Sequence, residues 1–235
     1  MGDQAAVTTT IEDGVAVVRF DDGKANVLSP DAITALGAAF DQAEAQARAV
    51  CLVGRPGKLC AGFDLSIMQA GPDASKRLVA SGGELLMRVF VHPQPVVVAV
   101  TGHALAAGAL VLLSCDLRIA ADVPAKIGLN ETAIGMPLPQ FALELAQDRL
   151  DRRRITEATV GARIYDPNEA TEAGYVDRVV PLDELEATAI AEARRLGQLN
   201  ATAYATTKRS LRQPIVDRTR AGAAADMERF FVDPT

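Results

Sequence analysis

The sequence feature that most constrains the fold is a stretch without formal charge from Pro95 to Cys115, with His103 counted as neutral. A stretch of this length can cross a bilayer. Its composition is uneven, however, because a largely β-branched block at 96–100 precedes Thr101-Gly102, and alanine and leucine dominate residues 104–113. A buried strand, a turn at 101–102 and a buried helix explain this order better than a membrane span does. We therefore expect an α/β protein with an enclosed strand and helix and no membrane segment.

Strand and helix patterns alternate along the first three quarters of the chain. Asp13-Gly14 joins two strands within residues 8–20 and is typical of a type I′ hairpin turn. Ser29-Pro30 begins a helix, with serine as the N-cap and proline in the first turn. From Leu182 onward the pattern is mainly helical. This order predicts an α/β fold with a helical C-terminal segment, divided into residues 1–181 and 182–235. Other helices are expected at 64–70, 74–91, 106–113, 138–149 and 151–159, and other strands at 49–53, 96–100, 116–120, 126–129 and 175–180.

The composition excludes several classes of protein. Hydrophobic residues make up 49% and charged residues 23% of the chain, which is typical of a globular domain and not of a disordered one. A net charge of −6 and an aromatic content of 4% argue against a nucleic-acid partner. The spacing of Cys51, Cys60 and Cys115 favours core packing and predicts no metal site. The first ten residues lack a basic start followed by an apolar stretch, so we expect a cytoplasmic protein.

Two segments place a small-residue turn between a strand and the start of a helix. They are CAGFDL at 60–65 and TGHALAAG at 101–108. The first N–H groups of a helix lack internal partners and can point at an anion, and small side chains let a ligand approach them. Two such helix starts facing each other would form an oxyanion hole. Two tight turns without a function are the alternative, and the residues alone leave both interpretations open.

Two ionisable side chains are candidates for chemistry. Glu131 lies within the largely apolar stretch 127–137, where desolvation would raise the pKa of its carboxyl group. A raised pKa suits a general base, although a surface glutamate is the commoner case. His103 lies between a predicted strand and a buried helix, where its ring can line a pocket, although lone histidines are more often structural.

In their order and spacing these motifs resemble the crotonase (enoyl-CoA hydratase/isomerase) superfamily. The resemblance covers nearly the whole chain. It implies a ββα spiral whose helical C-terminal segment serves trimerisation, and an acyl-CoA thioester as the ligand. The residues that carry it are DDGKANVL at 21–28, CAGFDL at 60–65, PVVVAVTGHALAAGALVLLSCDLRIA at 95–120, GLNETAIGMPLP at 128–139, EAGYVDRVV at 172–180 and TTK at 206–208.

The resemblance also implies roles for individual residues. It assigns the two N–H groups of the oxyanion hole to Phe63 and Ala107, the latter in a turn where the family usually has glycines. Hydratases of the family use two glutamates, and this sequence has Leu110 at the first of these positions and Glu131 at the second. GLNET, with leucine at the first position, is similar to the 3-enoyl-CoA/2-enoyl-CoA isomerases. Implied substrate contacts are Lys24, Ala61, Asp64, Leu65, His103 and Leu110.

We therefore expect an enoyl-CoA isomerase of fatty acid metabolism, in which Glu131 alone transfers a proton from C2 to C4 of a 3-enoyl-CoA. Moving a double bond needs one base, whereas adding water needs a second acid–base group. Coenzyme A enters only as part of the substrate, and no metal or redox cofactor is needed. We also expect the chain to form a homotrimer or a dimer of trimers. The alternatives are a hydratase or another crotonase-type reaction, and a non-catalytic acyl-CoA-binding protein. The acyl chain length stays open, as does whether Lys208 reaches a CoA phosphate of its own or a neighbouring subunit.

Overall fold

The computed structural model describes residues 6–230, and its largest sheet has six strands in the order β1-β2-β4-β7-β9-β11. β1 and β2 form the antiparallel hairpin predicted around Asp13 and Gly14, which both have positive φ (48° and 81°) as a type I′ turn requires. The other neighbours are parallel. The strands are Val7–Glu12 (β1), Val15–Phe20 (β2), Ala49–Gly54 (β4), Val96–Val100 (β7), Leu117–Ala121 (β9) and Arg178–Val180 (β11).

Two small parallel sheets lie beside the large one and hold the loops of the functional site. One has the order β10-β8-β5 and the other pairs β3 with β6. Residues 101–102 do not form the expected turn, because Gly102 begins β8 and the helix starts only at Ala107. A Cβ atom on Gly102 would lie 2.1 Å from the Gly57 carbonyl oxygen, so glycine there permits a close backbone approach. The bounds are Val27–Leu28 (β3), Gly57–Cys60 (β5), Gly62–Phe63 (β6), Gly102–Leu105 (β8) and Ile127–Gly128 (β10).

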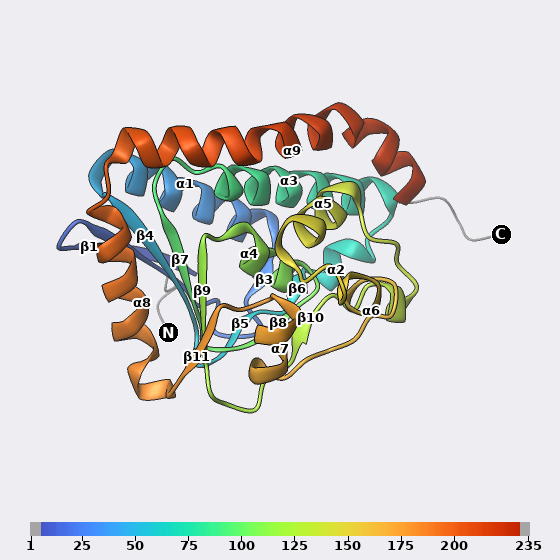
Figure 1. Cartoon of the computed structure of the whole chain (residues 1–235). Helices are drawn as coiled ribbons and strands as arrows, with labels where there is room; N and C mark the ends of the chain where they lie inside the picture. The colour runs from blue at the N-terminus through green and yellow to red at the C-terminus, as the bar shows by residue number, and fades with distance from the viewer. Residues whose placement is uncertain (1–5, 231–235) are drawn as a thin grey trace.

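Helices cover both faces of the six-stranded sheet (Figure 1). On one face α1, α3, α4 and α5 enclose the larger hydrophobic core, while α8 packs against the other face over a smaller core. α9 extends across α3 and α5. Ser29 caps α1 as predicted, by accepting a hydrogen bond from the Ala32 N–H. The helices are Pro30–Gln46 (α1), Leu65–Met68 (α2), Pro72–Phe90 (α3), Ala107–Ser114 (α4), Thr132–Ile134 (η1, a 3-10 helix), Gln140–Arg149 (α5), Ile155–Ala158 (α6), Pro167–Ala173 (α7), Leu182–Gly197 (α8) and Ala201–Phe230 (α9).

The uncharged stretch from Pro95 to Cys115 forms β7, β8 and α4, as a buried strand and helix rather than one long helix. Its side chains reach the core because the sheet is covered on both faces, which explains the near-continuous apolar sequence. Over residues 6–230, every helix is too short or too polar to traverse a lipid bilayer.

The helical segment after residue 181 shares the hydrophobic core with the rest of the chain. Ile190 and Leu196 of α8 pack against the smaller core, and Ile215 of α9 packs against the larger one. Phe231, an apolar residue of the C-terminal segment that is expected to serve trimerisation, lies outside the described residues. The division into residues 1–181 and 182–235 stays a prediction. Along the described part of this segment, the large apolar side chains that face solvent are Leu182 (53% exposed), Leu199 (46%) and Leu211 (71%).

Candidate active site

A largely apolar cavity of about 220 Å³ lies where β6, α2, α3, β8, α4, η1 and α5 meet. Two of its lining side chains, Leu65 and Ile134, are large, apolar and more than half exposed. Apolar side chains left open to solvent beside a cavity are typical of a ligand-binding mouth. The lining residues are Ala61, Phe63, Leu65, Met68, Val79, Leu105, Ala106, Leu110, Asn130, Glu131, Ile134, Met136, Pro139 and Phe141.

The backbone N–H of Phe63 points away from the neighbouring strand. In the parallel pair β3–β6, Leu28 lies opposite Phe63, and its carbonyl oxygen accepts from the N–H of Asp64 at 3.2 Å. Because alternate amides of a strand face opposite sides, the Phe63 N–H is directed outward from this pair. Phe63 precedes α2 by two residues, so its N–H belongs to the end of a strand and not to a helix start.

The second amide belongs to Ala107, the first residue of α4. An N–H at this position has no acceptor within its own helix. Ala107 is buried and its neighbour Ala106 lines the cavity, with the unusual φ of 50° that sets the helix entry. Gly62 has a φ of 109°, and a Cβ atom there would lie 3.2 Å from the Ala106 Cβ and 3.3 Å from the Leu105 carbonyl oxygen, so glycine lets the turn before Phe63 approach the start of α4 closely. The fold therefore brings the Phe63 and Ala107 turns together.

Glu131 contributes a buried carboxylate to the cavity. The residue is 7% exposed, and its Oε2 atom has no hydrogen-bond partner among the described residues. Burial raises the pKa of Glu131 to about 7. The neighbouring Asn130 also lines the cavity, with a buried Oδ1 that is unpaired within residues 6–230. A carboxyl group that titrates near neutrality can accept a proton and return it, which is the work of a general base.

Leu110 contributes an apolar side chain to the wall of the same cavity. It lies on α4, is 1% exposed, and lines the space together with Glu131. Among the lining residues of the described chain, Glu131 is the one acidic side chain. The arrangement therefore offers one acidic proton acceptor in largely apolar surroundings.

The other implied substrate contacts divide into two groups. Ala61 and Leu65 line the cavity, whereas Lys24, Asp64 and His103 do not. The carboxylate of Asp64 caps α2 by accepting from the Ser66 N–H at 2.9 Å, and His103 Nδ1 lies 2.9 Å from the Lys126 N–H. The functional roles of all these residues stay predictions.

Lys208 forms an ion pair with Asp116 of its own chain. It is 6% exposed, and its Nζ lies 2.7 Å from Asp116 Oδ2, while Arg212 binds Asp116 Oδ1 at 2.6 Å. Burial lowers the pKa of Lys208, and the Asp116 carboxylate counteracts this. Lys208 therefore joins α9 to the end of α4, and a contact with a CoA phosphate stays a prediction.

Two aromatic rings of the cavity wall occupy space that side chains on two adjacent glycines of α3 would fill, and the sequence analysis did not single out these glycines. A Cβ atom on Gly82 would lie 2.3 Å from the Phe63 ring, and one on Gly83 would lie 2.9 Å from the Phe141 ring. Glycine inside a helix costs about 1 kcal/mol relative to alanine, so a Gly-Gly pair in the middle of α3 is a signal of close packing. The pair indicates close packing against α3, but only the folded structure shows that Phe63 and Phe141 are the partners.

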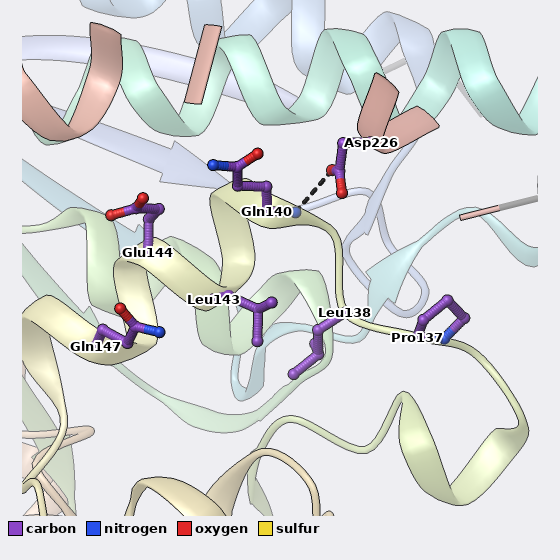
Figure 2. Close-up of a pocket in the computed structure, with 7 residues that line it drawn as sticks. All are labelled: Pro137, Leu138, Gln140, Leu143, Glu144, Gln147 and Asp226. Atoms are coloured by element: carbon purple, nitrogen blue, oxygen red, sulfur yellow. Dashed lines mark hydrogen bonds between the residues drawn. The ribbon is translucent and has the colours of Figure 1, made fainter. Parts of the chain in front are cut away.

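The first turn of α5, which carries Phe141, is held from α9. Figure 2 shows Asp226 directed at the start of α5, where its Oδ2 accepts from the Gln140 N–H at 2.7 Å. The contact satisfies an N–H that lacks a partner within its own helix. It therefore fixes the backbone beside Pro139 and Phe141, which both line the cavity.

Comparison with known proteins places the chain in a family. The family model described as "Enoyl-CoA hydratase/isomerase" matches residues 10–233. The chain belongs to the enoyl-CoA hydratase/isomerase family. It is 32% identical to "Enoyl-CoA delta isomerase 1, mitochondrial" of Homo sapiens, over 92% of this chain and 74% of that protein. It is 34% identical to a "Putative enoyl-CoA hydratase" of Thermus thermophilus, over 76% of this chain and 73% of that protein.

Solved structures of the enoyl-CoA hydratase/isomerase family confirm the crotonase fold. The chain superposes on a family protein from Pseudomonas syringae with a TM-score of 0.93 and 39% identity, covering 96% of this chain and 98% of that one. The chain is therefore an enzyme of the enoyl-CoA hydratase/isomerase family, and this family acts on acyl-CoA thioesters. Its relatives carry both isomerase and hydratase names, so the distinction between these reactions depends on the site itself.

Proposed function

We propose that the protein is an enoyl-CoA isomerase of fatty acid metabolism that converts 3-enoyl-CoA to 2-enoyl-CoA. The observation that carries the proposal is the pairing of one buried carboxylate, Glu131, with apolar Leu110 in a single cavity. Adding water across a double bond requires one group to activate water and another to deliver a proton. Moving the double bond requires only that one base take a proton and return it elsewhere.

The proposed reaction uses two amides and one carboxylate. The thioester oxygen accepts hydrogen bonds from the Phe63 and Ala107 N–H groups, which contribute about 3–4 kcal/mol of transition-state stabilisation each. The Glu131 carboxylate takes a proton from C2, so the electron pair spreads through a dienolate to the thioester oxygen. The protonated Glu131 then delivers the same proton to C4. Coenzyme A is part of the substrate, and the proton transfer calls for no metal or redox cofactor.

Hydration is the second candidate, and the hydratase name of the Thermus thermophilus relative favours it. It would need a second acid–base group beside Glu131, where this chain has Leu110. A non-catalytic acyl-CoA-binding protein needs no proton acceptor, so the free-energy cost of burying the Glu131 carboxylate argues against this alternative.

The test measures isomerisation of a 3-enoyl-CoA and hydration of a 2-enoyl-CoA separately. We expect wild type to isomerise faster than it hydrates. Glu131→Gln should reduce isomerisation by at least about a thousandfold while substrate affinity stays within about twofold, because the amide keeps the shape but accepts no proton. Glu44→Gln, an exposed change of the same kind, is the control. A wild-type rate in Glu131→Gln would contradict the assignment.

Assembly and location complete the proposal. A homotrimer or a dimer of trimers is supported by the exposed Leu199 and Leu211, which the single chain leaves uncovered. A cytoplasmic location stays a prediction, since the human relative is named as mitochondrial.

A further inference from the structure

Phe141 stands between the active-site cavity and a second, smaller one. Its ring is 5% exposed and lines both spaces. The second cavity measures about 90 Å³ and lies between α3 and α9, behind the wall that Phe141 contributes to the active site. Its lining includes Gly83, Glu84 and Met87 of α3, and Thr219, Arg220 and Asp226 of α9.

The backbone that carries Phe141 is fixed, so the ring is the movable part of this wall. Asp226 holds the start of α5 through the Gln140 N–H at 2.7 Å, and Arg218 of α9 pairs with Glu144 of α5 at 2.8 Å. Aromatic side chains change position by rotation between a few χ1 wells. The ring packs directly against the Gly83 backbone, where a Cβ atom would lie 2.9 Å from two of its carbons.

The second cavity is suited to receive an aromatic ring. Met87 of its lining is 1% exposed, and methionine side chains adapt readily to a changing neighbour. Thr219 is 6% exposed and its hydroxyl oxygen is unpaired within residues 6–230. The lining also includes the Arg220–Glu84 ion pair, whose side chains are 50% and 56% exposed, so the cavity is bordered by solvent on that side. The space behind Phe141 is therefore available to an aromatic ring.

We propose that Phe141 determines the acyl-chain length that the enzyme accepts, by turning into the second cavity when a longer acyl chain enters the first. This inference rests on the proposed function in one respect, because it takes the occupant of the first cavity to be the acyl chain of a thioester. Short chains bind with the ring in its present place. Longer chains gain apolar contact only after the ring has moved toward α9.

The test measures the affinity of saturated acyl-CoA thioesters, from butanoyl-CoA to dodecanoyl-CoA, by calorimetry. Phe141→Ala joins the two cavities and should raise the affinity for the longer thioesters by about fourfold per additional methylene buried. Thr219→Leu fills the second cavity from the side away from the substrate and should weaken the longer thioesters about tenfold more than the shorter ones. Leu143→Ala, on the outer side of the same helix, is the matched control and should leave the profile unchanged.

The outcomes separate the two proposals because binding of saturated thioesters involves no turnover. Thermal unfolding first shows that each variant is folded. Unchanged chain-length profiles in both folded variants would overturn the role of Phe141, even if the wild type isomerises 3-enoyl-CoA. If the two variants shift the chain-length profile in the expected opposite directions but the wild type does not isomerise 3-enoyl-CoA, the proposed reaction is rejected and the role of Phe141 stands.

Discussion

At the scale of single residues, the burial of Glu131 links activity to pH. The pKa of this carboxyl group is raised from its ordinary value of 4.5 to about 7 because the cavity removes it from water. A general base works in its ionised form. We therefore expect kcat/KM for isomerisation to rise with pH up to about 7 and then to level off, which a pH–rate profile of the wild type measures. A profile that is flat between 4.5 and 7 would assign the proton transfer to another group.

The same pKa difference predicts how stability depends on pH. The folded state holds the Glu131 proton more tightly than the unfolded state, so its stabilising effect is complete below 4.5 and is lost as the pH rises through 7. Glu131→Gln should therefore increase the unfolding free energy by about 3 kcal/mol above neutral pH and change it little below the ordinary pKa. Urea unfolding of both proteins at the two extremes checks this, with Glu44→Gln as the control.

Leu110 determines, in our proposal, which of two reactions the site performs. Leu110→Glu introduces a second carboxylate beside Glu131, and two close carboxylates raise one pKa. We expect the isomerase rate to fall at least about tenfold, weak hydration at most, and a loss of several kcal/mol in stability from the buried charge. Leu110→Gln separates size from charge. A wild type that hydrates faster than it isomerises would show that Leu110 is no obstacle to water addition.

At the scale of secondary structure, α5 depends on a cap supplied by another helix. The Asp226 carboxylate is 8% exposed and lies at the positive end of α5, bound to the Gln140 N–H. A hydrogen bond to a charged group contributes about 1.5–3 kcal/mol. We expect Asp226→Ala to lower the unfolding free energy by about this amount, and Asp226→Asn to lower it by less because an acceptor remains. Urea unfolding measures both, and equal stability of all three proteins would contradict the capping role.

At the scale of the whole molecule, ion pairs join α9 to the rest of the protein, yet some apolar side chains near it remain exposed to solvent. Lys208 and Arg212 bind Asp116 from one side of α9, while Leu199 and Leu211 border an open groove of about 510 Å³ near this cluster. We expect light scattering to give three or six times the 24.7 kDa of one chain. Leu211→Glu should lower this mass, and the exposed Ser210→Glu should not. A mass of one chain for the wild type at micromolar concentration would contradict the proposed assembly.

The sequence alone determined the features whose causes lie within a few residues. Asp13-Gly14 specifies the hairpin because both residues tolerate positive φ, and Ser29 begins α1 because its hydroxyl reaches the Ala32 N–H. The strand at 96–100 followed from its apolar pattern. Glu131 could be singled out for the same reason, since apolar neighbours along the chain indicate a buried carboxylate. The motif order also led to the correct family.

The tertiary structure alone decided the features that join distant residues. Lys208 and Asp116 are 92 positions apart, and no local pattern pairs a lysine with an aspartate across such a separation. Gly102 looks like a turn residue until the close approach of Gly57 explains it as part of a strand. Phe141 reaches the cavity because α3, α5 and α9 pack together, which depends on Gly83 lying under its ring. Packing places side chains by shape in three dimensions, whereas propensity and periodicity act only between neighbours along the chain.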